Sequence, residues 1–508
     1  MPLMYCHAKL KNISQHTVIF AHLFLPDYSP MNRDSFYPAI ACFPLLLMLA
    51  GCAPMHETRQ ALSQQTPAVQ VDTALPTALK NGWPDSQWWL EYHDDQLTSL
   101  INNALQNAPD MQVAEQRIQL AEAQAKAVAT QDGPQLDFSA DMERQKMSAE
   151  GLMGPFALND PAAGTTGPWY TNGTFGLTAG WHLDIWGKNR AEVTARLGTV
   201  KARAAEREQT RQLLAGSVAR LYWEWQTQAA LNTVLQQIEK EQNTIIATDR
   251  QLYQHGITSS VEGVETDINA SKTRQQLNDV AGKMKIIEAR LSALTNHQTK
   301  ALKLNPVALP KVASQLPDEL GYSLLARRAD LQAAHWYVES SLSTIDAAKA
   351  AFYPDINLMA FLQQDALHLS DLFRHSAQQM GVTAGLTLPI FDSGRLNANL
   401  DIAKAESNLS IASYNKAVVE AVNDVARAAS QVQTLAEKNQ HQAQIERDAL
   451  RVVGLAQARF NAGIIAGSRV SEARIPALRE RANGLLLQGQ WLDASIQLTG
   501  ALGGGYKR

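Results

Sequence analysis

Cysteine is nearly absent from this chain of 508 residues. The three cysteines are Cys6, Cys42 and Cys52, and none occurs in the rest of the chain. Disulfide frameworks, thiolate metal sites and cysteine nucleophiles all require this side chain. The main body of the protein therefore uses none of these three chemistries.

An excess of charge and the common catalytic motifs are also missing. The chain carries 45 basic and 49 acidic side chains, whereas nucleic-acid binders need a basic face to replace counterions. His-Glu-x-x-His, Gly-x-Ser-x-Gly and phosphate-binding Gly-Lys-Ser/Thr do not occur, and the 12 histidines are scattered. We therefore expect no nucleic-acid partner, no metal, no cofactor and no enzymatic activity. Gly503-Gly504-Gly505 is predicted to be a flexible tail, not a nucleotide loop.

The N-terminal region carries one short apolar run, Leu45–Ala50, which is too short to span a membrane as a helix. Its small-residue ending and the preceding Arg33 are typical of a secretory signal. Met31 would make a normal signal start, so we hypothesise that translation begins there.

Leu49-Ala50-Gly51-Cys52 resembles the bacterial lipobox. This resemblance implies cleavage before Cys52, a diacylglyceryl lipid on its thiol and an N-acyl chain on its new amino group. Three acyl chains exceed what stable anchoring needs. Because Ala53 is not the aspartate of an inner-membrane retention signal, we expect the outer membrane. The alternative is an ordinary buried cysteine.

The body of the chain repeats itself. Gly176-Leu-Thr-Ala-Gly180 recurs as Gly381-Val-Thr-Ala-Gly385, 205 positions later, and Leu183 to Arg190 continue the match as Leu388 to Arg395. Before these motifs the two copies are 220 positions apart, as at Pro134 and Pro354, which implies 15 extra residues in the first copy. After them, the glycine breaks at Gly256 and Gly463 are 207 positions apart. Chance similarity between alanine-rich helices is the alternative.

Each copy contains two segments in which apolar and polar residues alternate, as in β-strands with one apolar face. The apolar positions are Leu136, Phe138, Ala140 and Met142; Phe175, Leu177, Ala179, Trp181, Leu183 and Ile185; Ile356, Leu358, Ala360 and Leu362; and Val382, Ala384, Leu386, Leu388 and Ile390. Long loops are expected at residues 150–170 and 363–380. The pattern fits either a soluble sandwich or a membrane barrel, and the secretion signal favours the barrel. Because four strands cannot close a pore, the barrel interpretation predicts a homotrimer with twelve strands.

Each strand pair is followed by a very long predicted helix without proline, from Lys188 to Tyr253 and from Arg395 to Phe460. A helix of 66 residues is roughly 100 Å long and needs other helices beside it. Narrow coiled-coil seams are predicted at Leu214, Val218, Leu221 and Trp225, and at Val418, Val422, Val425, Ala429, Val432 and Ala436. The polar remainder, including Gln431, would line a water-filled tube.

Taken together, the chain resembles the TolC-like outer-membrane factors, in the lipoprotein branch that partners RND-type multidrug pumps. Further shared motifs are Gly82-Trp83-Pro84, Trp88-Trp89, Arg327-Arg328-Ala329-Asp330, Phe352-Tyr353-Pro354 and Leu388-Pro389-Ile390-Phe391. Ala329 stands where the family usually has proline, so this chain lacks a residue that would make the turn more rigid. The resemblance implies a mainly α-helical protomer that is internally duplicated and forms a trimer. That trimer would have a 12-stranded outer-membrane β-barrel and a long α-helical periplasmic tunnel. Its implied partners are a periplasmic adaptor (membrane fusion protein), an inner-membrane pump and outer-membrane lipid.

The resemblance also assigns roles to the two glycine breaks. His255, Gly256, Ile257, Gly463, Ile464 and Ile465 would form the tip that contacts the adaptor, although both turns can equally be simple helix caps. Arg469 and Glu472 occupy positions where relatives carry an acidic ring that binds cations. They are a predicted tip gate, and solvated surface charges are the alternative.

We divide the chain into an extension and signal peptide (1–51), a lipid-anchored segment (52–95), a first repeat (96–305), a linker (306–328), a second repeat (329–502) and a tail (503–508). The expected function is a passive exit duct for small toxic compounds in a tripartite drug efflux system. A duct that secretes peptide or polysaccharide, and a periplasmic coiled-coil lipoprotein without a pore, are the alternatives.

Overall fold

A computed structural model describes residues 55, 62–65, 79–80, 82–148, 150–151, 159–160, 165–166, 169–257, 260–296, 302–311, 314–315 and 321–506. Cys52 and the predicted signal therefore lie outside the described residues. The chain forms two compact units, and the features below belong to the unit of Met55–Thr387 and Phe391–Arg508.

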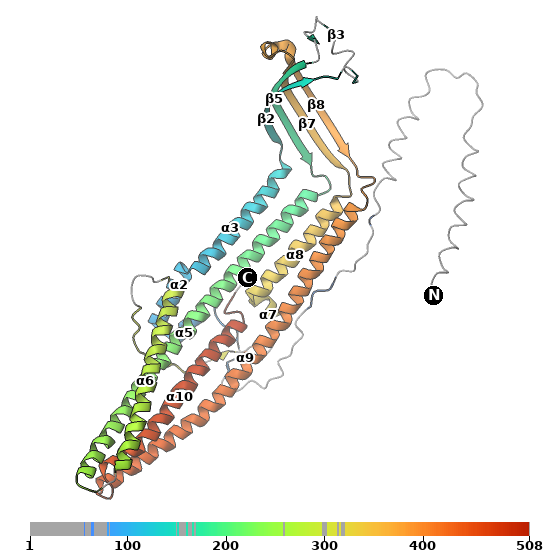
Figure 1. Cartoon of the computed structure of the whole chain (residues 1–508). Helices are drawn as coiled ribbons and strands as arrows, with labels where there is room; N and C mark the ends of the chain where they lie inside the picture. Colours follow the sequence, from blue (N-terminus) through green and yellow to red (C-terminus); the bar gives the residue numbers. More distant parts are fainter. Residues whose placement is uncertain are drawn as a thin grey trace, which may run out of the picture. The chain divides into compact units, whose positions relative to one another are not determined.

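Long helices and one small sheet make up this unit (Figure 1). The helices are α2 (Asp95–Asn107), α3 (Pro109–Ala129), α5 (Lys188–Gln254), α6 (Ser260–Leu294), α7 (Gly321–Arg327), α8 (Ala329–Ala350), α9 (Arg395–Asn461) and α10 (Gly467–Ala501). Short 3-10 turns are η1 (Trp88–Tyr92), η2 (Thr130–Asp132), η4 (Leu369–Asp371) and η5 (His375–Ala377). The strands are β1 (Leu79–Lys80), β2 (Gln135–Lys146), β3 (Asn159–Asp160), β4 (Thr165–Thr166), β5 (Trp169–Leu183), β6 (Ser314–Gln315), β7 (Asp355–Ala366) and β8 (Gln378–Thr387). No helix of the described part is long and apolar enough to cross a bilayer.

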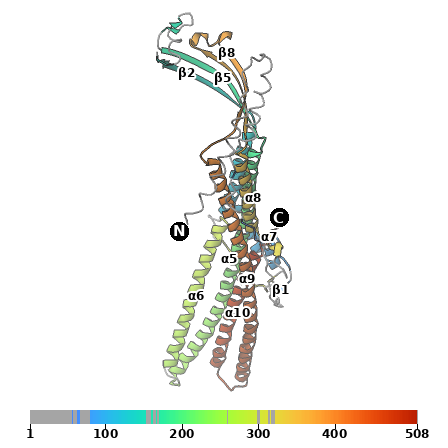
Figure 2. The same cartoon turned by 90° about the vertical axis from the view of Figure 1, so that its right-hand side faces the viewer.

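The helices form one layer in which α5 and α9 run the full length. Near the sheet, α8 packs between α5 and α9, and α3 packs on the other side of α5. Farther from the sheet, α10 packs between α5 and α9, and α6 packs on the other side of α5. Figures 1 and 2 show the layer from two directions, with the sheet at one end and the α5–α6 and α9–α10 turns at the other. The two predicted long helices are confirmed, and each has 67 residues.

All four predicted strands are present, in one antiparallel sheet of order β2-β5-β7-β8. Their ends differ from the prediction. β5 stops at Leu183 because the next residue, Asp184, accepts hydrogen bonds from the Asn189 and Arg190 amides at the start of α5. β8 stops at Thr387, two residues before Pro389, which lacks a ladder donor. β7 instead continues into the predicted loop, where the Gln363 side-chain Nε2 donates to Gln379 Oε1 of β8 at 2.9 Å.

The shift between the copies was predicted wrongly at the second strand. Gln135 pairs with Gly180 in the first copy, and Asp355 pairs with Thr387 in the second. With the first strands 220 positions apart, the second strands are therefore 207 apart, not 205. The same shift relates the αL glycines before the long helices, Gly187 and Gly394. The Gly-x-Thr-Ala-Gly similarity aligned the second strands two residues out of register. A shift of two residues along a strand leaves every side chain on the same face, so the alternating pattern does not reveal the error.

The predicted helix seams are only partly correct. On α9, Val418, Val425, Ala429 and Val432 are buried, but Val422 is only partly buried. The continuous buried row consists of Ile411, Tyr414, Val418, Ala421, Val425, Ala428, Val432 and Leu435. On α5 the buried surface is much wider than one seam because α2, α3, α6, α8 and α10 all pack against this helix.

A second layer covers the middle of α5. η1 and α2 bury Trp88, Trp89, Leu97 and Ile101 against α5, in one core with Tyr222 and Trp223. The Tyr222 hydroxyl donates to Asp94 Oδ2 at 2.6 Å, and burial raises the pKa of this phenol. Asp94 also caps α2, accepting from the Leu97 amide. The Trp88-Trp89 motif is therefore structural.

The expectation of a flexible tail is wrong for Gly503–Gly505, which are buried and all have positive φ. The Gly504 amide closes α10 by donating to the Thr499 carbonyl at 2.8 Å. A Cβ on Gly503 would overlap the Arg327 carbonyl, and one on Gly505 would overlap the Asp85 carbonyl. Glycines are needed here because the backbone has positive φ and lies in direct contact with two other segments, which leave no room for a Cβ.

Candidate functional site

The sheet has one exposed apolar face of the kind that a lipid-facing strand needs. Leu136, Leu177, Ala179, Ala360, Leu362, Met380 and Val382 line a shallow depression on it, drawn from all four strands. Several of these side chains are highly exposed, with Val382 reaching 81%. In water such a surface is unfavourable, whereas in a bilayer it is expected.

Aromatic side chains lie at the two ends of this apolar band. At the helix end, the Trp181 indole donates to the Asp132 carbonyl and the Trp186 indole donates to the Pro354 carbonyl, both at 2.8 Å. Trp186 also stacks on Tyr353. At the loop end, Trp169 and Phe373 are exposed. Aromatic girdles of this kind mark the two interfaces of membrane barrels.

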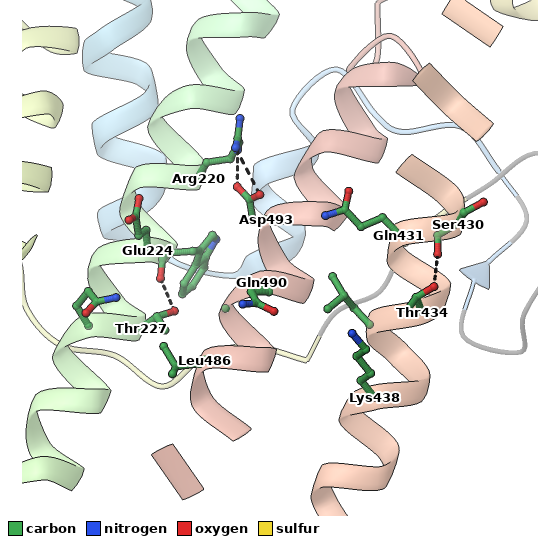
Figure 3. Close-up of a pocket in the computed structure, with 14 residues that line it drawn as sticks. Arg220, Glu224, Thr227, Ser430, Gln431, Thr434, Lys438, Leu486, Gln490 and Asp493 are labelled. Carbon is green, nitrogen blue, oxygen red and sulfur yellow. Dashed lines mark hydrogen bonds and ion pairs between the residues drawn. The ribbon is translucent and has the colours of Figure 1, made fainter. Parts of the chain in front are cut away.

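Below the sheet, α5, α9 and α10 form an open polar groove of about 700 Å³. The Arg220 guanidinium binds Asp493 with two nitrogens, which connects α5 to α10. In Figure 3 this pair lies at one end of the groove, while Gln431 and Lys438 of α9 lie across from Thr227 of α5. The predicted polar surface at Gln431 is thus part of a polar concave face. The sequence did not reveal its partner α10, because this contact depends on how the return helix is placed.

The two predicted tip turns have the same geometry. Gly256 and Gly463 both have φ of 70°, and the amide that follows each glycine donates to a carbonyl five residues earlier, from Ile257 to Leu252 and from Ile464 to Arg459, each at 2.9 Å. These are Schellman caps, in which glycine takes the left-handed conformation.

The turns also expose apolar side chains. Ile257 is 68% exposed and Ile464 63%, whereas Ile465 is only partly exposed. His255 is exposed as the C-cap of α5. The structure thus brings the predicted tip residues to one end of the helical layer; what they contact stays a prediction.

Arg469 and Glu472 are also close together. The Arg469 guanidinium donates to Glu472 Oε2 at 2.7 Å on the first turn of α10, and this hydrogen bond raises the arginine pKa. Both side chains are exposed, so the pair adds little stability. Nearby, Arg474 and the Ser471 hydroxyl both bind Glu241 of α5, at 3.3 and 2.6 Å. This second contact holds α10 to α5 near the tip, and no pattern in the sequence indicates it.

The N-terminal segment provides one contact that sequence reasoning did not anticipate. The Leu62 amide donates to Asn408 Oδ1 at 2.9 Å, and the Gln65 amide donates to Asn415 Oδ1 at 2.7 Å. Asn415 also donates to the Ser63 carbonyl at 3.0 Å. Asn408 and Asn415 are seven residues apart, so they lie on one face of α9. We call residues 62–65 the strap.

No group of three or more potential metal ligands occurs among the residues that the structure describes. The site therefore consists of surfaces: an apolar strand face, a polar groove and two turns.

Comparison with known proteins identifies this arrangement. The family model "Outer membrane efflux protein" matches residues 100–297 and 320–504, and each stretch holds a strand pair and a long helix. The multidrug resistance outer membrane protein MdtQ of Escherichia coli O157:H7 is 98% identical over 478 residues, which is 94% of this chain and 100% of the relative. MdtP of Escherichia coli strain K12 is 36% identical over 466 residues, 91% of this chain and 94% of the relative.

Two solved structures have the same protomer fold. The outer membrane protein VceC of Vibrio cholerae is 25% identical, with a TM-score of 0.70, and the match covers 84% of this chain and 100% of that one. The CmeC outer membrane channel of Campylobacter jejuni is 19% identical, with a TM-score of 0.75, over 90% and 95% of the two chains. The predicted TolC-like fold is confirmed, and the chain belongs to the outer membrane efflux protein family.

Proposed function

We propose that this chain is the outer-membrane channel component of a tripartite drug efflux system. It is a passive exit duct for small toxic compounds across the periplasm and the outer membrane. One observation carries the proposal: a strand pair with an apolar face continues, twice in the chain, into a 67-residue helix. The apolar face of the strands can therefore contact lipid, and the long helices continue the wall of the duct from the strands into the periplasm. The related proteins MdtQ and MdtP are named multidrug resistance outer membrane proteins, which agrees with this proposal.

The working form is a homotrimer. β2 and β8 are the two edges of the sheet, and lipid does not satisfy unpaired edge groups. Pairing β8 of one copy with β2 of the next closes the sheet, and three copies give twelve strands, a porin-like number. Planar-bilayer conductance of purified protein tests the duct; absence of channels would favour a scaffold without a pore.

A periplasmic adaptor and an inner-membrane pump complete the system, and the adaptor docks on the tip turns. Ile257 and Ile464 are the apolar anchors, held outward by Gly256 and Gly463. We expect Gly463→Trp to leave trimers in the membrane and to abolish drug export in a complemented strain. Normal export would contradict the docking role. Export of peptide or polysaccharide instead of drugs would favour the secretion alternative.

The Arg469–Glu472 pair is proposed to help hold the tip closed. Removing the acceptor with Glu472→Ala should raise the opening rate of reconstituted channels. Glu437→Ala, an exposed acidic residue of α9, is the matched control. An unchanged opening rate would show that the pair is only a solvated surface contact.

Cys52 is proposed to carry the N-acyl chain and the diacylglyceryl lipid, which anchor the protein to the outer membrane. Labelled fatty acid should enter the wild-type protein and be lost in Cys52→Ala. Label retained in that variant would place the lipid elsewhere.

A further inference from the structure

The charged side chains of the four-stranded sheet are separated by sign between its two faces. Residues directly opposite each other in an antiparallel ladder lie on the same face, so the strand registers place each residue on the apolar face or on the opposite, polar face. The polar face carries all the carboxylates of the four strands, at Asp137, Asp141, Glu143, Asp355 and Asp365. The apolar face carries the only lysine and arginine of these strands, Arg144 and Lys146. The two cations therefore have no acidic partner in the strands on their own face.

The two cations continue the apolar row of β2 at its loop end. The row consists of Leu136, Phe138, Ala140 and Met142, and the next two positions on the same face are Arg144 and Lys146. All of these side chains are exposed. Figure 1 shows this end of β2, and the start of β5 beside it, at the end of the sheet away from the helices.

The spacing along β5 places both cations at one edge of the apolar band. Trp169 lies directly opposite Lys146, and Trp181 at the helix end of the sheet follows twelve residues later. At about 3.3 Å per residue and a tilt of about 40°, the two indoles are about 30 Å apart along the membrane normal. The apolar band of a membrane barrel is about 25 Å tall. Arg144 and Lys146 are therefore at the level of the lipid head groups, beyond the hydrocarbon.

The local geometry suits a single anion. Arg144 and Lys146 are two residues apart on one strand face, so their Cα atoms are about 7 Å apart and both side chains can reach one group between them. The Arg144 guanidinium carbon lies over the Trp169 ring, 5.9 Å from its centroid. A guanidinium can donate two parallel hydrogen bonds to a phosphate, and the lysine ammonium adds a third donor.

Phosphate is the anion that this position offers. Basic side chains beside a membrane bind the anionic head groups of its lipids. The loop end points away from the periplasmic helices, so in the proposed orientation it meets the outer leaflet. In Gram-negative bacteria that leaflet consists of a glycolipid whose sugar core carries phosphate groups.

We infer that Arg144 and Lys146 of each copy bind a phosphate group of the outer-leaflet glycolipid. Three equivalent sites then surround the barrel of the homotrimer. The inference rests on the proposed function, which sets the loop end outward, and it adds a lipid of defined head-group chemistry as a partner.

Competition between two glycolipids tests the site. Purified trimers are incubated with lipid A that carries two phosphates, or with the same lipid A after removal of both phosphates, and native mass spectrometry counts the lipids retained. Wild-type trimers should retain the phosphorylated form at an about tenfold lower concentration, because charge-assisted hydrogen bonds are lost with the phosphates. Arg144→Gln with Lys146→Gln should retain both forms equally. Equal retention by the wild type would overturn the inference.

Two control variants make the result specific. Lys188→Gln with Lys349→Gln removes two cations from the helix end of the sheet and should keep the preference for the phosphorylated form. Loss of the preference in this variant, with the preference intact in the Arg144 and Lys146 variant, would place the phosphates at the opposite membrane surface and overturn the inference. Arg144→Lys with Lys146→Arg keeps both charges and should keep the preference.

Assembly is read from the same spectra. If the double glutamine variant yields no trimers, Arg144→Gln and Lys146→Gln are measured singly, and each should lose part of the preference. Variant trimers that keep the full preference would overturn the inference and leave the duct unaffected. Wild-type protein that forms no trimers and no channels in planar bilayers would contradict the proposed function instead.

Discussion

Ala329 begins α8 at the position where Pro109 begins α3, 220 residues earlier. Proline suits the first position of a helix, and Arg328 before it already has the extended conformation that proline requires, with φ of −104° and ψ of 118°. We predict that Ala329→Pro stabilises the protein by roughly 0.5–1 kcal/mol. Thermal melts in detergent measure this. Ala347→Pro, inside α8, should destabilise it, and a lower melting temperature for Ala329→Pro would contradict the prediction.

Gly503 provides the opposite case, because its φ of 95° is unfavourable for a side chain. Gly503→Ala should lower the free energy of unfolding by at least about 1–2 kcal/mol from backbone strain, and by more from the overlap with the Arg327 carbonyl. Urea titration followed by circular dichroism measures the loss. Gly500→Ala is the control, since it lies inside α10 with nothing within 4 Å and should be neutral or stabilising.

At the scale of elements, the layer of η1 and α2 depends on the indole of Trp89, which is only 2% exposed. Trp89→Ala removes a large side chain from the core shared with α5 and should cost about 3–5 kcal/mol. Limited proteolysis should then cut within α2 before it cuts α5. Leu90→Ala, at a neighbouring exposed residue, should change little. Unchanged protease resistance of Trp89→Ala would show that other contacts hold this layer.

Sequence reasoning identified the elements far better than their contacts. The proline-free stretches ending at Gly256 and Gly463 predicted α5 and α9 almost to the residue. The seam on α9 was placed one residue off at alternate positions, for example at Val422 instead of Ala421, because both neighbouring residues are apolar and the sequence fits either row. The tip glycines were found because their conformation is local. The strap and the Glu241 contact were not, since both join residues more than 200 positions apart.

At the scale of the whole molecule, the orientation of the sheet in the membrane can be tested on β8. Val382 lies on the apolar face and is 81% exposed, while Thr383 points to the other face. An arginine facing lipid near the bilayer centre costs about 2–4 kcal/mol, whereas one facing the lumen is tolerated. Val382→Arg should therefore reduce the amount of protein recovered from the outer membrane, and Thr383→Arg should not. The reverse result would mean that the sheet is turned inside out.

The strap limits how far the proposed lipid can be from the duct. Asn408 lies thirteen residues after the start of α9, or about 20 Å along the helix from the sheet. Ten residues separate Cys52 from Leu62, and a fully extended chain of that length reaches about 35 Å. A lipid on Cys52 can therefore lie no farther than about 35 Å from Leu62. If Cys52 carries the proposed lipid, the strap therefore keeps that lipid close to the subunit that bears it.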